Sequence, residues 1–482
     1  MLANRTAPHP HAPSAGPTEV AGGVQVATRE RQRADILRYR PVAALLRSRW
    51  YPGVFQVVVA AVFVIVGWQL LLGPTADYDN LGTALMWIAW WPLIPVAFLL
   101  FGRFWCAVCP FGALSDLVQR WVGAHRPVPR FLKRYGVWII DAAFLAITWS
   151  DHVWGVVASP WGSGVLVLLL ITAVVASGAL FQRRTFCRYL CFLGGLAGNY
   201  SRAGMIELRA DTDICVSCTS RAACFNGTSA VPACPVFEFP RTMDTSANCI
   251  LCANCVKSCP NDAITITVRP PTRELWSVRT PQLEASFLAA AIMGIVLIQN
   301  VTMLGVWNHI LSWTQRTTGM TNYPVIFTMA FIAAIAAPVG GLALAAKAIA
   351  NAEASTFRNA FAAFGYALIP LDMAAHIAHN LFHLLAEGKA LGFTAMGVFG
   401  HPHELDMSTR LASTGTIRIL QYVLLAFGVI GSLYVAWRTS ARRTGGEQSA
   451  SALALFGPVA VLIAILATAN VWLFMQPMMM RM

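Results

Sequence analysis

The chain has 482 residues, of which 57% are hydrophobic and only 12% are charged, and its mean hydropathy is +0.58. Soluble domains carry about 25% charged residues, so the composition excludes an ordinary soluble protein and predicts a polytopic membrane protein. The formal net charge is +13. Because lysine and arginine collect in the cytoplasmic loops of membrane proteins, this basic excess does not indicate nucleic-acid binding.

Residues 1–50 are rich in alanine, proline and arginine and contain no early apolar core. They do not resemble a signal peptide, and we expect a disordered cytoplasmic tail. Nine later stretches are apolar and long enough to cross the roughly 30 Å hydrocarbon core of a bilayer. Asp141, Asp151 and His152 make the third stretch the least apolar. The nine predicted spans are residues 53–72, 83–101, 136–158, 163–181, 287–307, 325–346, 361–386, 416–437 and 452–474.

The lysines and arginines predict the orientation of these spans. With the N-terminus in the cytoplasm, 30 of the 35 basic residues lie in segments predicted to be inside, and four lie in segments predicted to be outside. This is the positive-inside pattern, and it predicts a bacterial inner-membrane protein with a cytoplasmic N-terminus and a periplasmic C-terminus. The twelve cysteines fall in the cytoplasmic segments. Thiols stay reduced there, so we expect them to bind metal and not to form disulfides.

Two cysteine pairs follow the second and fourth predicted spans. Cys106 and Cys109 stand in the run Arg-Phe-Trp-Cys-Ala-Val-Cys-Pro, and Cys187 and Cys191 stand in the run Cys-Arg-Tyr-Leu-Cys. Both pairs leave their helices at the cytoplasmic face, so we expect them to meet in space. Four thiolates there would ligate an iron–sulfur cluster, in addition to the two clusters expected below, or form a redox-active thiol set. The alternative is buried free cysteine with no such role.

The cytoplasmic segment after the fourth span contains two further sets of four cysteines. The second set, residues 249–260, has the C-x2-C-x2-C-x3-C-P spacing of bacterial ferredoxins, and a short strand is expected at 263–266 to cover it. The first set has wider spacing and ends at Cys234-Pro235. Zinc is the alternative ligand for four cysteines, but the tight second run is typical of cubane clusters.

In two-cluster ferredoxins the last cysteine of each run ligates the other cluster. Two [4Fe–4S] clusters are therefore expected, and each takes three cysteines from one run and one from the other. The expected ligands of the first cluster are Cys215, Cys218, Cys224 and Cys259. The expected ligands of the second cluster are Cys249, Cys252, Cys255 and Cys234.

The seventh predicted span carries a row of ionisable side chains. At 100° per residue they share one helical face, and ionisable residues inside a membrane are costly and mark functional sites. The row consists of Asp372, His376, His379 and His383. Three further histidines are predicted on the same outer side, namely His309, His401 and His403.

An apolar barrier of roughly 30 Å is too wide for one efficient electron step, so a centre in the outer half or a mobile quinone is expected. Imidazole suits haem iron, for which Met303, Met320 or Met329 would be the second ligand, and imidazole with thioether suits copper. The methionine-rich end, residues 475–482, is predicted outside and is the thioether candidate. The alternative is hydrogen-bonded helix packing without a cofactor.

Four spans with cysteine pairs after the second and fourth, followed by a twin-cluster insert, resemble the polyferredoxin-like membrane proteins of the NapH/NosR/CcoG type. The resemblance covers roughly residues 50–270 and implies inner-membrane electron transfer that serves a respiratory reductase or metal-centre maturation. Members usually show C-x3-C-P at both pairs, whereas this chain has C-x2-C-P at the first and Phe192 after Cys191. The five spans that follow lie outside the resemblance.

The predicted fold class is a mainly α polytopic bundle of about nine spans with a small inserted α+β ferredoxin-like domain. Its expected parts are a tail, 1–50, a four-span block, 51–200, the insert, 201–280, and a five-span block, 281–482. The predicted function is electron transfer between a quinone or a cytoplasmic donor and a periplasmic acceptor, as an oxidoreductase component in contact with lipid and redox partners. The alternatives are a copper reductase with an outer His/Met site and a redox-sensing membrane protein or transporter.

Overall fold

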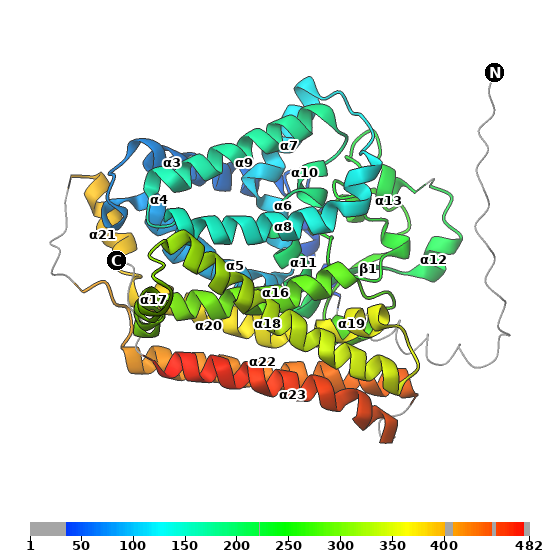
Figure 1. Ribbon diagram of the computed structural model, residues 1–482. Helices are drawn as coiled ribbons and strands as arrows, with labels where there is room; N and C mark the ends of the chain where they lie inside the picture. The colour runs from blue at the N-terminus through cyan, green and yellow to red at the C-terminus, as the bar shows by residue number, and fades with distance from the viewer. Residues whose placement is uncertain (1–34, 221, 401–407, 446–449, 477–482) are drawn as a thin grey trace.

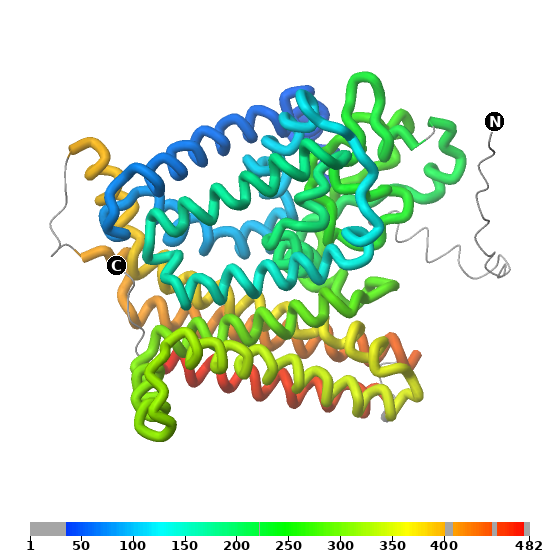
Figure 2. Tube along the Cα trace, turned by 45° about the horizontal axis from the view of Figure 1, so that its top comes forward, coloured from blue at the N-terminus to red at the C-terminus, as the bar shows by residue number. Residues whose placement is uncertain are grey.

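The computed structural model describes residues 35–220, 222–400, 408–445 and 450–476, and helices dominate it (Figure 1). Its long helices run side by side along one direction, and β1, α12 and α13 lie together at one end of the bundle (Figures 1 and 2). Helices α17 and α21 lie at the opposite end. The segment between α11 and α16, which we call the insert, therefore occupies one end of a helical bundle.

The N-terminal part contains the helices that carry the first cysteines. The structure differs from the predicted tail in residues 36–47, where two short helices form; residues 1–34 lie outside the described residues. The elements are η1 Ile36–Arg38, α2 Arg40–Arg47, α3 Gly53–Leu72, η2 Asp77–Asp79, α4 Leu81–Thr83, η3 Ala84–Trp90, α5 Trp91–Phe101, α6 Phe104–Val108, α7 Pro110–Val122, α8 Arg130–Trp154, α9 Pro160–Leu180, α10 Thr185–Tyr189 and α11 Leu193–Ala203.

The C-terminal part forms the second half of the bundle. Helix α20 is buried along its whole length and packs on α22, α16 and α5, so it joins the two halves. The elements are α16 Leu283–Thr302, α17 Gly305–Thr318, α18 Tyr323–Ala352, α19 Phe357–Gly365, η5 Tyr366–Leu368, α20 Ile369–Ala386, α21 Ala390–Val398, α22 Thr414–Thr444 and α23 Ala450–Met475. A shared core with Phe98, Tyr200 and Leu288 makes the halves one unit.

Eight helical segments in the described part of the chain are long and apolar enough to cross a membrane. They correspond to eight of the nine predicted spans: 53–72, 81–101, 160–180, 283–302, 323–352, 357–386, 414–444 and 451–475. The remaining predicted span, 136–158, falls in α8, which is a continuous helix but carries more polar residues. Ala124 donates its backbone N–H to Ala179 O at 2.7 Å, so α8 begins where α9 ends. Helix α8 thus runs back toward the opposite end of the bundle, where α9 begins.

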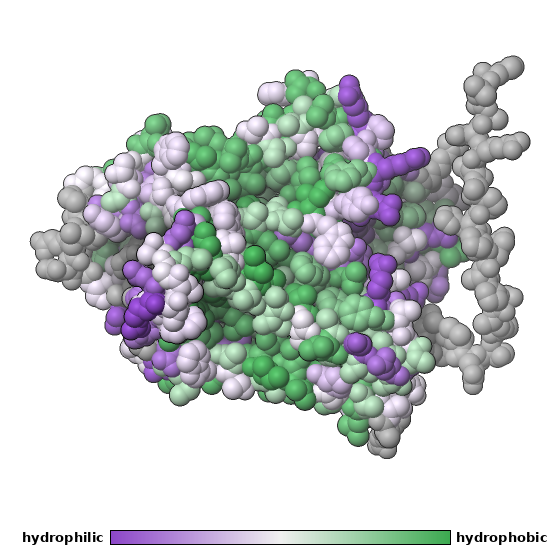
Figure 3. All heavy atoms as spheres, viewed as in Figure 1, coloured by the Kyte–Doolittle hydropathy of each residue, from purple (hydrophilic) through white to green (hydrophobic). Residues whose placement is uncertain are grey.

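The surface of the bundle shows the polarity expected for a membrane protein. Apolar side chains gather around its middle, and hydrophilic side chains gather at both ends (Figure 3). Outward-facing residues of α3 and α23 include Val57, Val64 and Val461, which are at least 60% exposed. Burial against lipid accounts for such apolar exposure, because these faces have no protein neighbour.

The insert is built around two antiparallel strands. Strands β1, Ile206–Ala210, and β2, Ile264–Val268, pair from Ile206 opposite Val268 to Ala210 opposite Ile264. Their inward residues Leu208 and Ile266 are buried beside the second cysteine set. The strand predicted at 263–266 thus begins one residue later and extends to 268. The remaining elements are α12 Thr212–Val216, α13 Ala223–Asn226, η4 Pro240–Thr242, α14 Asn254–Ser258 and α15 Arg273–Ser277.

A buried ion-pair network holds the insert to the bundle. Glu274 on α15 accepts from Arg209 on β1 at 2.8 Å and also pairs with Arg269, which follows β2. Arg269 donates to the carbonyl oxygens of Ser201 and Arg202 at the end of α11. The strands, α15 and α11 are therefore joined through a few buried charges.

Candidate iron–sulfur centres

All twelve cysteines are free thiols and fall into three groups of four. In the first group, Cys224 lies close enough to the other three thiols for their charges to raise its pKa, which burial already raises, to about 11. Its members are Cys215, Cys218, Cys224 and Cys259. Cys259 comes from the second sequence run, so the structure brings together the four residues expected for the first cluster.

The second group contains the remaining cysteines of the insert. Burial raises the pKa of Cys255 well above its ordinary value, and the nearby charges of Cys249, Cys252 and Cys234 raise it further. Cys234 belongs to the first sequence run and joins the other three here. Cys234 therefore lies within electrostatic range of the three thiols with which it is expected to share a cluster, and that ligand set stays a prediction.

The loop around Cys252 aims backbone N–H groups at sulfur. Leu251 and Ala253, on either side of Cys252, adopt φ of 55° and 61° in the left-handed region. Non-glycine residues rarely adopt this conformation, and alternating turns of this kind form anion-binding nests. Accordingly, the N–H of Leu251 donates to Cys249 and that of Asn254 donates to Cys252. Hydrogen bonds to the sulfurs of an iron–sulfur cluster are a main determinant of its reduction potential.

The third group unites the two membrane cysteine pairs. Burial raises the pKa of Cys191 to about 12, and the charges of Cys106 and Cys109 act in the same direction. The charges of the other three thiols also raise the pKa of Cys187. The loops after α5 and α9 therefore place four thiols within electrostatic range of one another, and a third cluster or a redox-active thiol set there stays a prediction.

Two buried arginines accompany this third group. Arg103 is 5% exposed and hydrogen-bonds the thiol of Cys106. Arg184 is 2% exposed, forms an ion pair with Asp116 at 2.6 Å and donates to Cys106 O at 3.1 Å. A β-carbon at Gly112 would approach the Arg184 guanidinium to 2.6 Å, so this glycine makes room for the cation. The two cations offset the charge of deprotonated thiols.

The three groups form one series. The charge of Cys224 in the first group raises the pKa of Cys255 in the second. The charges of Cys187 in the third group and of Cys252 in the second both raise the pKa of Arg184. Arg184 therefore lies within electrostatic range of both groups. The series therefore runs from the outer part of the insert to the membrane helices.

The donor sets fit iron–sulfur clusters. Within the described residues, no three histidine, cysteine or acidic side chains converge closely enough for a single metal ion. A cubane differs, because its four thiolates bind separate iron atoms. Burial makes a charged thiol costly, and coordination to iron reverses this cost because a coordinating thiol is deprotonated. The N–H donors and the arginines fit the same negatively charged thiolates.

The histidine row on α20 is buried, and each histidine has its own hydrogen-bond partner. His376 Nδ1 lies 2.9 Å from Tyr200 Oη, whose hydroxyl also donates to Asp372 at 3.4 Å. His379 Nδ1 lies 2.8 Å from Asn300 Oδ1, and His383 lies 3.3 Å from Glu387. These contacts account for the orientation of the row by hydrogen bonding.

The other residues predicted near the row lie elsewhere or outside the description. His309 is exposed on α17, whereas the row is buried. His401, His403 and the methionine tail from residue 477 onward lie outside the described residues. A haem, copper or quinone site thus stays a prediction, and so does the alternative of packing without a cofactor.

A chain of aromatic rings connects the third cysteine group with the histidine row. Trp105, next to Cys106, lies 5.7 Å from Trp90 between ring centroids, and Trp90 lies 6.0 Å from Trp91. Trp91 in turn lies 6.0 Å from His376. The ring series continues the line of the cysteine groups into the middle of the bundle.

Helices of membrane-spanning length and clustered cysteines are typical of membrane iron–sulfur proteins. The model of a family described as a 4Fe-4S binding domain matches residues 83–129 and 163–205, which contain both membrane cysteine pairs. Two proteins of Escherichia coli (strain K12) are similar: YccM, named as a candidate electron transport protein, is 26% identical over 202 residues, and the ferredoxin-type protein NapH is 28% identical over 198. Over that region the chain is similar to the NapH-like polyferredoxin membrane proteins.

These likenesses are partial. Each match covers 37% of this chain and spans 54% of YccM and 66% of NapH. No solved structure matches the chain. The matches and the apolar helices support a membrane protein with a 4Fe-4S binding region.

Sequence reasoning missed the charged residues around the cysteines. Arg184 stands three residues before Cys187, but its pairing with Asp116 on α7 carries no local signal. The same holds for Arg209, Arg269 and Glu274, which are far apart in sequence. A buried arginine beside a cysteine pair is the one signal that could have been found, because arginine in an apolar context needs a partner.

Proposed function

We propose that the chain passes electrons between a quinone or a cytoplasmic donor and a periplasmic acceptor, such as a respiratory reductase or a metal-centre maturation system. Two [4Fe–4S] clusters in the insert and a third at the membrane cysteines would supply one-electron chemistry. The observation that carries the proposal is the series of three cysteine groups, with Arg184 between the second and the third. A protein that only sensed redox state would need one such group.

The protein residues divide the route into two parts. The cysteine groups lead from the insert to the cytoplasmic ends of α5 and α9. From there the rings of Trp105, Trp90 and Trp91 lead to His376, deep in the bundle. Packed atoms carry electronic coupling better than a gap does, so the ring series supports the histidine row as the outward end of the route.

The cluster count tests the proposal. Purified protein should contain about 12 iron atoms and as much acid-labile sulfide per chain, which is three cubanes, and its visible absorption should bleach with dithionite. The double variant Cys106→Ser/Cys187→Ser should lose about four of these iron atoms. The matched variant Cys215→Ser/Cys224→Ser should lose the same number from a different EPR signal. Unchanged iron in the first variant would remove the membrane centre from the proposal.

A further inference from the structure

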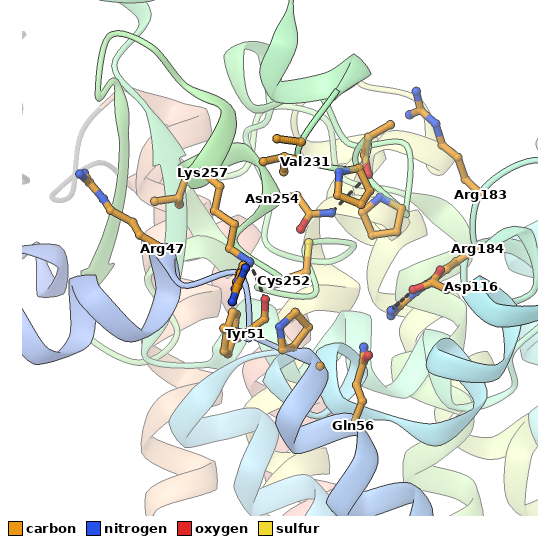
Figure 4. Close-up of a pocket in the computed structure, with 18 of the residues that line it drawn as sticks. Arg47, Tyr51, Gln56, Asp116, Arg183, Arg184, Val231, Cys252, Asn254 and Lys257 are labelled. Carbon is orange, nitrogen blue, oxygen red and sulfur yellow. Dashed lines mark hydrogen bonds and ion pairs between the residues drawn. The ribbon is translucent and has the colours of Figure 1, made fainter. Parts of the chain in front are cut away.

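A cleft of about 790 Å³ opens beside the second cysteine group. Its walls are the end of α2, the start of α3, the last turn of α7, the loop after α9 and the insert (Figure 4). We call it the basic cleft and define it by Arg47, Arg49, Arg120, Arg183, Lys257 and Cys252. Sites for small ligands measure about 300–1,000 Å³, so the cleft has the size of a nucleotide site.

The charge of the cleft selects an anion. Its lining holds six arginines and lysines but only two aspartates. Each aspartate already has a partner, since Asp262 pairs with Arg47 at 2.9 Å and Asp116 pairs with Arg184 at 2.6 Å. The other four cations have no carboxylate partner among the described residues; they are Arg49, Arg120, Arg183 and Lys257. Arginine and lysine together are the usual ligands of phosphate.

The remaining lining indicates what kind of anion fits. Val231, Pro232 and Pro235 form an apolar wall that suits the flat face of a ring. Cys252 and Cys259, one expected ligand from each cluster, also line the cleft. Figure 4 shows Cys252 and Asn254 between Lys257 on one side and Arg184 on the other. A molecule held there would contact the cysteine groups directly.

We propose that the basic cleft binds a flavin nucleotide, with its phosphate on Arg49 and Arg120 and its ring beside Cys252; this rests on the proposed function and names its electron donor. Nicotinamide nucleotides give electrons in pairs as hydride, whereas an iron–sulfur cluster accepts one at a time, and flavins do both kinds of chemistry. Oxidation of a reduced flavin releases two electrons and two protons. The two cysteine groups of the insert match the two electrons, and the protons leave through the open cleft.

The test is binding of flavin mononucleotide to the full-length protein in detergent or nanodiscs, followed by fluorescence. Inorganic pyrophosphate should compete. The double variant Arg49→Gln/Arg120→Gln should bind about tenfold more weakly, because each charged contact to phosphate contributes more than a neutral one. Arg134→Gln is the matched control, since Arg134 is exposed on α8 and does not line the cleft. It should bind as the wild type does.

Four outcomes overturn the inference. The flavin does not bind, the double variant binds it as tightly as the wild type does, or the protein binds NADH more tightly than the flavin. The fourth is a double variant that loses only the binding of an acidic redox protein. Iron content and the dithionite-reduced EPR spectrum are recorded on the same samples. Normal clusters without flavin binding reject the donor site alone. Flavin binding without iron rejects the proposed function and leaves the site.

Discussion

Arg184 is the single residue that touches the most parts of the predicted route. Its side chain contacts Asp116 on α7 and the Cys106 carbonyl. The charges of thiols from two different cysteine groups also raise its pKa. Asp116 and the cysteine charges raise its pKa far above the ordinary value even though burial lowers it, so the guanidinium is charged. A fixed positive charge at this position stabilises extra negative charge on either side of it.

We expect Arg184→Gln to lower the reduction potential of the membrane centre, because the reduced state carries one more negative charge. A loss of about one tenfold step in the redox equilibrium corresponds to about 60 mV for one electron, and an EPR-monitored redox titration would measure it. Arg184→Lys keeps the charge and should stay near the wild-type potential. If lysine lowers the potential as much as glutamine does, the geometry of Arg184 and not its charge sets the potential.

At the scale of elements, β1, β2 and α15 depend on one carboxylate. Burial by itself raises the pKa of Glu274, but Arg269 and Arg209 outweigh it and bring the pKa to about 2. The hydroxyl of Thr245 and the N–H of Ser246 also donate to this carboxylate. Glu274 is 2% exposed, so water cannot replace these partners when one of them is removed.

Glu274→Gln should destabilise the insert by about 3–5 kcal/mol, the usual cost of breaking a buried ion pair. Because the pKa is depressed on folding, the contribution of Glu274 is present above about pH 4.5 and is lost as the pH falls toward about 2. Thermal unfolding followed between pH 7 and pH 3 should therefore show a steeper decline for the wild type than for the variant. Parallel declines would assign the acid sensitivity to other groups.

The elements also show what the sequence could predict. The apolar length of α3 predicted its limits, 53–72, to the residue, because a span is set by bilayer thickness and not by its neighbours. The assignment of the cysteines to clusters rests on their spacing, since a cubane needs thiols at fixed separations, and it stays a prediction. Residues 36–47 were expected to be disordered but form helices, because Asp35 and Lys257 contribute long-range contacts with the insert and the segment before α3. Such contacts have no local pattern.

The path of the chain through the whole molecule requires α8 to cross the membrane. If it did not, the loops after α5 and α9 would lie on opposite sides, whereas the structure brings their cysteines together. The bridge between Arg126 and Phe181 gives the same answer. We therefore expect nine crossings, one more than apolarity alone indicates.

Fusions of alkaline phosphatase and of green fluorescent protein would measure this topology. Phosphatase should be active after residue 156 and after residue 320, because both positions follow an odd number of spans from a cytoplasmic start. The fluorescent protein should be bright after residues 125 and 354. An inactive phosphatase and a bright fluorescent protein after residue 156 would mean that α8 lies on the surface of the membrane.

The contacts of the first described residues imply an order of biosynthesis. Lys257 donates to the Tyr51 carbonyl, and Asp35 bridges to Thr267, so the start of the chain is completed by residues made more than 200 positions later. Domains generally fold in the order in which the ribosome makes them. Here the segment before α3 has to wait until the insert has emerged. The insert is complete before α16 is made, which gives the cell an interval to load iron while the second half of the bundle is still being translated.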